Sequence, residues 1–300
     1  MSVDAIDAFR TIVDTRLHNP GAIALAAAER VPAASPVGPC GKAMIVAADH
    51  PARGALRSGS RPMAMADRAD LLERLRTALA RPGVTGVLAT ADILEDLLLL
   101  RNPDGSGVLD GKSVFGSMNR GGLAGATWEI DDRFTGYDAA GIARMGFEGG
   151  KMLLRLDYDD DRTVPTLESC ARAVNELNAA RVTAMVEPFI SGRTDGVIRN
   201  DLSPDAVARS MAIASGLGNT SAYTWLKLPV VTEMERVMAT STLPTVLLGG
   251  ELSEDPDAAF ARWGEALKLP NVIGLTVGRS LLYPADDDVV AAVDTAVGLL

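Results

Sequence analysis

Lys227 stands in an otherwise apolar and aromatic stretch, SAYTWLKLPVV, which covers residues 221–231. The chain contains five lysines against twenty-four arginines, so it meets most of its need for positive charge with arginine. A lysine differs from an arginine because its amine can lose a proton and condense with a ketone or an aldehyde. The resulting Schiff base draws electrons from the adjacent carbon–carbon bond, which is the chemistry of aldol cleavage. The alternative is a strand-end lysine whose amine reaches solvent.

Charged residues near the ends of other strand-like segments would share a cavity with this lysine. Alternation along KMLLRLD turns Lys151, Arg155 and Asp157 to one face, and the same parity directs Asp49 and Glu187 inward. We expect Glu187 to move protons and Asp49 to assist or orient it. Lys151 is the second cation that, together with burial, would favour a neutral catalytic amine. An ion-pair network that only holds the interior together is the alternative.

Two glycine-containing strand ends, LLGGE and TVGRS, indicate a phosphate site. Gly249, Gly250 and Gly278 would let backbone N–H groups approach an oxyanion, and Arg279 would add a charge-assisted contact. Simple turn glycines are the alternative.

The sequence gives no support for a metal or an organic cofactor. Histidines are the usual ligands of catalytic metals, and the chain has only His18 and His50. The acidic run DYDDDR, residues 157–162, is more typical of a solvated loop. We therefore expect no cofactor and no metal.

Composition restricts the partners and the compartment. The net charge is −10 and the pI is about 4.8, whereas nucleic-acid binders usually display a basic stripe. Apolar runs are too short to span a membrane, and the two cysteines lack metal-ligand spacing. We expect a cytoplasmic protein that binds neither nucleic acid nor membrane.

Eight short apolar runs bounded by turn residues predict eight strands, with helical patterns between most of them. Strands that alternate with helices form parallel βαβ units, and eight such units close a (β/α)8 barrel with its active site at the C-terminal strand ends. A doubly wound open sheet is the alternative, but AADHPARGAL, after the first strand, lacks the glycine-rich dinucleotide fingerprint. The predicted strands are 42–49, 84–90, 113–118, 150–157, 182–188, 222–228, 244–250 and 272–278, and the predicted helices are 66–80, 91–101, 166–180, 203–218 and 255–268.

We therefore predict an α/β fold in which residues 1–300 form a single barrel domain. Residues 1–40 are expected to be an N-terminal helical extension that closes the bottom of the barrel.

After residue 40 the chain resembles the class I aldolase superfamily that includes tagatose-1,6-bisphosphate aldolase, deoxyribose-phosphate aldolase and the archaeal fructose-bisphosphate aldolases. The motifs that carry the resemblance are DHPARG, TGYD, KMLL, VEP, WLKL and the final GG and GR pairs. The resemblance implies a Schiff base on Lys227 and catalytic roles for Glu187, Asp49 and Lys151.

VFGSMNRGGLAG and FISGRTDGVIRNDL differ from the tagatose enzyme, and the chain is more similar to an actinobacterial aldolase-like group associated with inositol catabolism. That resemblance implies cleavage of 2-deoxy-5-keto-gluconate 6-phosphate into dihydroxyacetone phosphate and malonate semialdehyde. The carboxylate of this substrate needs a cation, for which the candidates are Arg53, Arg120, Arg155 and Arg193.

Other substrates and activities are open alternatives. As an aldolase, the protein could instead cleave tagatose bisphosphate, fructose bisphosphate, sulfofructose phosphate or deoxyribose phosphate. It could also be a phosphate-binding barrel isomerase or decarboxylase, or a non-catalytic sugar-phosphate sensor. In each case the expected partner is a small phosphorylated sugar, and related barrels suggest a homo-oligomer.

Overall fold

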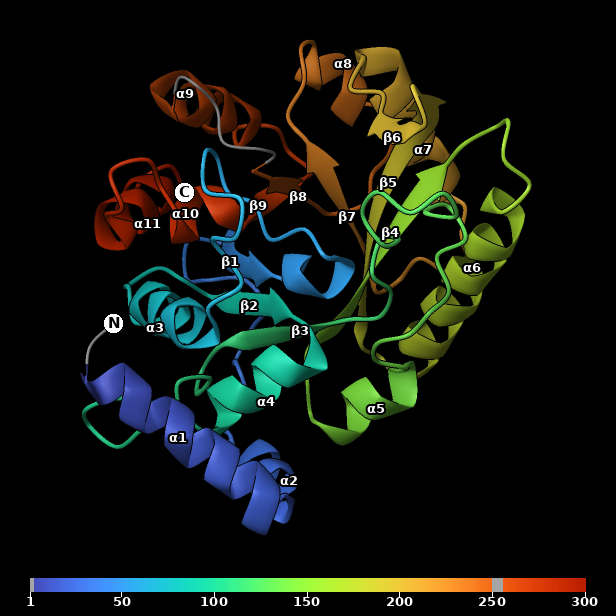
Figure 1. Cartoon of the computed structure of the whole chain (residues 1–300). Helices are drawn as coiled ribbons and strands as arrows, with labels where there is room; N and C mark the ends of the chain where they lie inside the picture. The colour runs from blue at the N-terminus through green and yellow to red at the C-terminus, as the bar shows by residue number, and fades with distance from the viewer. Residues whose placement is uncertain (1–2, 250–255) are drawn as a thin grey trace.

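Eight parallel strands close into a barrel in the computed structural model, which describes residues 3–249 and 256–300. The ring runs β1, β2, β3, β4, β5, β7, β8, β9 and returns to β1, because β4 pairs with β5 and β9 pairs with β1 (Figure 1). The fold is the predicted (β/α)8 barrel. Its strands are β1 Ala43–Ala48, β2 Gly86–Ala89, β3 Ser113–Ser117, β4 Gly149–Leu156, β5 Thr183–Thr194, β7 Thr224–Pro229, β8 Thr245–Leu248 and β9 Val272–Val277.

Helices cover the outside of the barrel, and four of them begin at a side chain that caps the first turn. The side chains of Asp67, Asp138, Ser203 and Asp288 each accept a hydrogen bond from a backbone N–H of the first helical turn. The helices are α1 Val3–His18, α2 Gly21–Glu29, α3 Arg68–Leu79, α4 Ala91–Leu99, α5 Ala139–Arg144, α6 Thr163–Ala179, α7 Pro204–Ser215, α8 Met234–Met238, α9 Pro256–Ala266, α10 Arg279–Leu282 and α11 Val289–Val297, with a 3-10 turn, η1, at His50–Arg53.

The barrel has two apolar layers that follow the alternation of its strands. One layer lies between the strands and the outer helices. The other fills the interior with Ile45, Leu88, Phe115, Met185 and Val246, all fully buried. Because these large side chains fill the lower interior, polar groups can gather only above them, toward the C-terminal strand ends.

The N-terminal helices do not close the bottom of the barrel, contrary to expectation. Helix α1 packs against α3 and α2 packs against α4, on the flank of the molecule (Figure 1). Their buried residues, including Ile12 and Ala26, join the outer apolar layer. The segment after α2 reaches the barrel interior instead, because Val37 packs against the inner layer and Arg30 donates to the carbonyl of Lys112 at 2.9 Å.

Strand β5 continues past the barrel, beyond the end of the predicted strand 182–188, and forms a hairpin. Its end pairs antiparallel with β6, Val197–Asn200. Asp195 and Gly196 make the turn with φ of 50° and 78°. An Asp-Gly pair between strand-forming residues is a strong hairpin signal, so the sequence did contain the information.

Candidate active site

Four buried charged side chains from four strand ends form a continuous chain of hydrogen bonds inside the barrel. Lys227 Nζ lies 3.1 Å from Glu187 Oε2, and Lys151 Nζ lies 2.7 Å from the same oxygen. Lys151 Nζ is also 2.8 Å from Asp49 Oδ2. The four side chains are 5–10% exposed. The structure therefore brings together all four residues that the sequence predicts to be catalytic.

Strand register explains how these residues meet. Leu153 on β4 pairs with Glu187 on β5, and Met185 pairs with Trp225 on β7. Every second side chain of a strand faces inward, so the next inward residue after Met185 is Glu187, and the next after Trp225 is Lys227. Glu187 and Lys227 therefore lie at the same level, above the Met185–Trp225 pair. Trp225 lies 5.9 Å from Phe115, between ring centroids, and closes the floor beneath them.

The ionisation of this cluster follows from burial and from its opposite charges. Burial alone would raise the pKa of Glu187, but Lys151 and Lys227 lower it to about 2. The same two cations outweigh burial and hold the pKa of Asp49 well below its ordinary value. Burial opposes the charged form of Lys151, yet Asp49 and Glu187 raise the pKa of its amine above the ordinary value. Near neutral pH both carboxylates are ionised and Lys151 is a cation.

Lys151 was expected to be the second cation that, together with burial, favours a neutral Lys227 amine. The structure instead places the Glu187 carboxylate between the two amines, within hydrogen-bond distance of both. A lysine beside a shared carboxylate has a proton acceptor at hand, which a purely cationic pocket would not provide.

The predicted phosphate residues lie at the ends of β8 and β9. A Cβ at Gly249 would lie 2.5 Å from Val277, and a Cβ at Gly278 would lie 2.4 Å from the carbonyl oxygen of Ala47, so packing requires glycine at both positions. Arg279 follows directly and donates to the carbonyl of Arg57 at 3.3 Å. Among the described residues, its buried Nε finds no partner. Gly250 lies outside the described residues.

The four candidate arginines divide into two pairs. Arg53 and Arg155 both donate to Glu129 inside the mouth of the barrel. Arg120 and Arg193 are more exposed and bind backbone carbonyls, those of Ala52 and Thr127, at 2.7 and 2.9 Å. The structure thus places the first pair in the cavity wall and uses the second pair to tie loops together.

Asp157 was also expected to face the interior, but it has a different role. Its backbone N–H and carbonyl both bond the Thr163 hydroxyl, and its side chain accepts from the Asp159 N–H. It therefore shapes the turn before α6, and none of its described contacts reaches the lysine cluster.

Three residues of the site were not identified from the sequence. Glu129 lies in the long irregular connection between β3 and α5, where no periodicity marks it. Asn119 bonds the backbone N–H and carbonyl of Leu153 at 2.8 and 2.7 Å and fixes the upper part of β4. His50 follows Asp49, with its Nδ1 3.8 Å from the Asp49 carboxylate. Its adjacency to Asp49 was the one available signal.

His50 differs in its ionisation from the neighbouring Asp49 and Lys151. Burial is the main cause that lowers its pKa to about 4, and the positive charges of Arg279, Lys227 and Lys151 lower it further, against the attraction of Asp49. The imidazole therefore stays neutral near pH 7.

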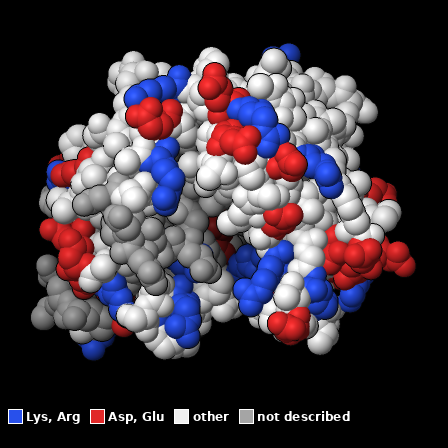
Figure 2. Space-filling view, turned by 90° about the horizontal axis from the view of Figure 1, so that it is seen from above, with Lys and Arg blue, Asp and Glu red and all other residues white. Residues whose placement is uncertain are grey.

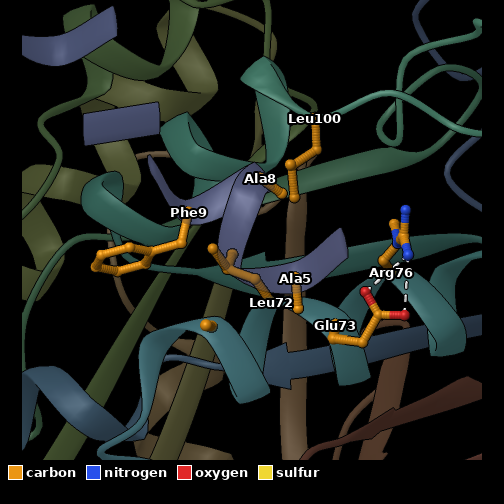
Figure 3. Close-up of a pocket in the computed structure, with 8 residues that line it drawn as sticks. Ala5, Ala8, Phe9, Leu72, Glu73, Arg76 and Leu100 are labelled. Carbon is orange, nitrogen blue, oxygen red and sulfur yellow. Dashed lines mark hydrogen bonds and ion pairs between the residues drawn. The ribbon is translucent and has the colours of Figure 1, made fainter. Parts of the chain in front are cut away.

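The surface outside this cavity offers less chemistry. Acidic and basic side chains alternate on the face in Figure 2, and its described part carries no continuous basic stripe. A small apolar pocket lies between α1 and α3, where Ala5, Phe9 and Leu72 line it (Figure 3). Its two charged residues, Glu73 and Arg76, pair with each other at 2.8 Å.

In residues 3–249 and 256–300 no helix could cross a membrane, and no cluster of potential ligands could hold a metal ion.

Comparisons with known proteins agree with this architecture. The profile of the Cgl0159-like family matches residues 41–297. The crystal structure of Cgl0159 from Corynebacterium glutamicum is 54% identical, with a TM-score of 0.93 over 98% of this chain and 96% of that one. A search of curated proteins gives no match.

Two aldolases share the fold at low sequence identity. A Schiff-base-forming fructose-1,6-bisphosphate aldolase is 18% identical, with a TM-score of 0.63 over 88% of this chain and 96% of that one. An archaeal fructose-1,6-bisphosphate aldolase, whose catalytic lysine is covalently bound to the carbinolamine intermediate of its substrate, is 17% identical, with a TM-score of 0.62 over 88% and 95%.

Proposed function

The chain belongs to the Cgl0159-like family, and we propose that it is a class I aldolase, a carbon–carbon lyase that cleaves a ketose-phosphate-like substrate through a Schiff base on Lys227. The observation that carries the proposal is the 3.1 Å hydrogen bond from the buried Lys227 amine to Glu187, inside the C-terminal end of the barrel. Barrel enzymes place their chemistry at this end. The covalent lysine of the archaeal aldolase with the same fold supports this assignment.

Schiff-base formation needs an acceptor for a proton of the Lys227 amine, and we assign this role to Glu187. Its carboxylate is ionised and already accepts the hydrogen bond of this amine. As the amine loses its charge, one of the two cations that lower the pKa of Glu187 disappears, so the carboxylate becomes a stronger base. The amine attacks the ketone carbon, and Glu187 returns the proton to the carbinolamine hydroxyl, which leaves as water. The product is a protonated imine on Lys227.

Cleavage then uses the same carboxylate. The hydroxyl on the far side of the scissile bond gives its proton to Glu187, and the bonding electron pair moves to the imine nitrogen. An aldehyde is released and an enamine remains on Lys227; protonation of its carbon and hydrolysis by water release the second product. Lys151 stays protonated throughout and holds Glu187 and Asp49 in position, through contacts of 2.7 and 2.8 Å.

The phosphate of the substrate is assigned to the ends of β8 and β9. Gly249 and Gly278 directly follow these two strands, and the Arg279 guanidinium beside them supplies positive charge. The Arg279 Nε and the Ser280 hydroxyl are buried without partners among the described residues, as expected of groups that bind a ligand.

A substrate consistent with this arrangement is 2-deoxy-5-keto-gluconate 6-phosphate, cleaved to dihydroxyacetone phosphate and malonate semialdehyde. Its ketone is adjacent to the phosphorylated carbon, so Lys227 would meet the ketone while Arg279 holds the phosphate. The acceptor hydroxyl then lies two carbons from the ketone, as aldol cleavage requires.

A retro-aldol assay with coupled detection of dihydroxyacetone phosphate tests this proposal. We expect turnover from the unchanged protein and none from Lys227→Met or Lys227→Arg, because neither replacement can form an imine. Lys112→Met is the matched control, since Lys112 donates to the Val84 carbonyl, away from the cavity. Turnover by Lys227→Arg would show that this position acts only through its charge.

A further inference from the structure

Arg53 and Arg155 share one carboxylate inside the mouth of the barrel. Arg53 Nη2 lies 3.0 Å from Glu129 Oε1, and Arg155 Nη1 hydrogen-bonds the same oxygen. The side chains of Arg53, Arg155 and Glu129 are 18%, 10% and 5% exposed. The second oxygen of Glu129 accepts from the backbone N–H of Gly125 at 3.0 Å. Two guanidinium groups and one carboxylate leave an excess positive charge in a largely buried cluster.

Most N–H donors of these two arginines have no partner in the described part of the chain. The Nε atom of each is buried and unbonded, and the side-chain hydrogen bonds found there go to Glu129. An outer arginine differs: Arg74 bonds Asp70, Asp287 and the carbonyl of Leu282. Buried cations are normally paired and fully hydrogen-bonded, so the inner pair has the donors and the charge to bind an anion.

The position of this cluster matches one end of a substrate. Three strands separate β4, which carries Arg155, from β9 in either direction around the ring, so Arg155 and Arg279 project from opposite walls. Leu153 on β4 is at the level of Glu187 on β5. Arg155 is the next inward residue after Leu153, so it lies about 7 Å further along the strand toward the mouth. Lys227, on β7, lies between the two walls.

We propose that Arg53 and Arg155 form a second anion subsite that binds a carboxylate on the aldehyde-derived half of the substrate, with Glu129 as the fixed counter-ion that positions both guanidinium groups. This inference rests on the proposed aldolase function and narrows its substrate class to keto acid monophosphates. Aldol cleavage then releases a small aldehyde that carries the carboxylate.

The charge balance favours a carboxylate over a second phosphate. Arg53 and Arg155 together carry two positive charges, and Glu129 cancels one of them. The remaining single charge matches a carboxylate, whereas a phosphate dianion would leave an unpaired negative charge in a buried wall. Bisphosphate ketoses should therefore be poorer substrates than a keto acid monophosphate.

Aldol condensation with dihydroxyacetone phosphate allows a direct test, because the acceptor aldehyde can be varied alone. 3-Oxopropanoate and propanal differ by a carboxylate in place of a methyl group, and glyceraldehyde 3-phosphate offers a phosphate. We expect kcat/KM to be highest for 3-oxopropanoate. Equal values for 3-oxopropanoate and propanal, or a higher value for glyceraldehyde 3-phosphate, would overturn the proposal.

Variants assign the preference to the cluster. Arg155→Gln and Arg53→Gln should each lower kcat/KM for 3-oxopropanoate by about 30-fold or more and leave propanal within about threefold. Glu129→Gln should shift the preference toward glyceraldehyde 3-phosphate, because the net charge of the cluster rises. Arg172→Gln, which alters an exposed ion pair with Glu168, is the matched control. Equal losses for both acceptors would contradict a carboxylate subsite.

Borohydride trapping of dihydroxyacetone phosphate alone separates this inference from the aldolase proposal, since this ketone lacks the second anion. The unchanged protein and folded Arg53→Gln and Arg155→Gln should trap it equally. Absence of trapping in the unchanged protein would refute the Schiff-base function itself. Normal trapping with an unaltered acceptor preference in both variants would refute only the second anion subsite; if Arg155→Gln does not fold, Arg53→Gln decides.

Discussion

Replacement of Lys151 by methionine removes the cation that joins Asp49 to Glu187. Lys151 Nζ lies 2.8 and 2.7 Å from these carboxylates, and its side chain is 5% exposed. Methionine has a similar length, so the substitution removes charge and hydrogen bonds rather than volume. Glu187 keeps Lys227 as a partner, but Asp49 loses its principal one. Removal of one member of a buried pair typically costs about 3–5 kcal/mol, and we expect this loss in the free energy of unfolding.

Urea denaturation at pH 7, followed by far-ultraviolet circular dichroism, measures this loss. Lys268→Met is the matched control, because its amine lies 2.7 Å from Glu265 but its side chain is 69% exposed. An exposed pair contributes at most about 1 kcal/mol, so the control should stay close to the unchanged protein. Equal losses in Lys151→Met and Lys268→Met would refute the claim that Lys151 holds the buried carboxylates.

The pH dependence of the same loss checks its electrostatic origin. Asp49 and Glu187 have pKa values below their ordinary 3.8 and 4.5, so their stabilisation is present above those values and is lost as the pH falls through the folded pKa. The difference between Lys151→Met and the unchanged protein should therefore shrink as the pH falls below 4.5 toward about 2. A difference that stays constant with pH would indicate a packing effect instead.

Three further predictions concern individual site residues. Glu187→Gln keeps the shape but removes the base, so kcat should fall by about 10²–10⁴-fold; near-normal turnover would transfer the role to Asp49 or water. Arg279→Ala should weaken binding of a phosphorylated substrate by about 2–5 kcal/mol; an unchanged KM would exclude it from the phosphate site. Burial lowers the pKa of His50 from 6.5 to about 4, so the unfolded chain binds the proton first and stability falls as pH drops through that range. His50→Gln should remove up to about 3 kcal/mol of this acid sensitivity in urea denaturation curves, and identical pH profiles would contradict the assignment.

The fold and the direction of the key side chains could be predicted because strand alternation is a local signal. Parity within single segments directs Asp49, Lys151, Arg155, Glu187 and Lys227 inward, and the structure places them in one cavity. The alternation within one strand does not predict which residues of neighbouring strands lie side by side. The register of β5 with β7 is what places a carboxylate between two amines, and register depends on the whole closed barrel.

Irregular segments were harder to interpret. Glu129 lies in a connection without periodicity, so its bonds to Arg53 and Arg155 depend on a loop path that no pattern encodes. The glycines at the strand ends illustrate a different difficulty. Close packing of Gly249 against Val277 already requires glycine, and a phosphate-binding role would require it as well. Sequence alone cannot separate these two reasons.

The most direct measurement of the central claim is borohydride reduction during turnover, followed by mass spectrometry of the digested protein. We expect a stable adduct on the peptide that contains WLKLP, with the added mass on Lys227, and no adduct in Lys227→Met. An adduct on Lys151 would keep the reaction class but contradict the assignment of the nucleophile. Turnover without any trapped lysine would contradict the Schiff-base mechanism.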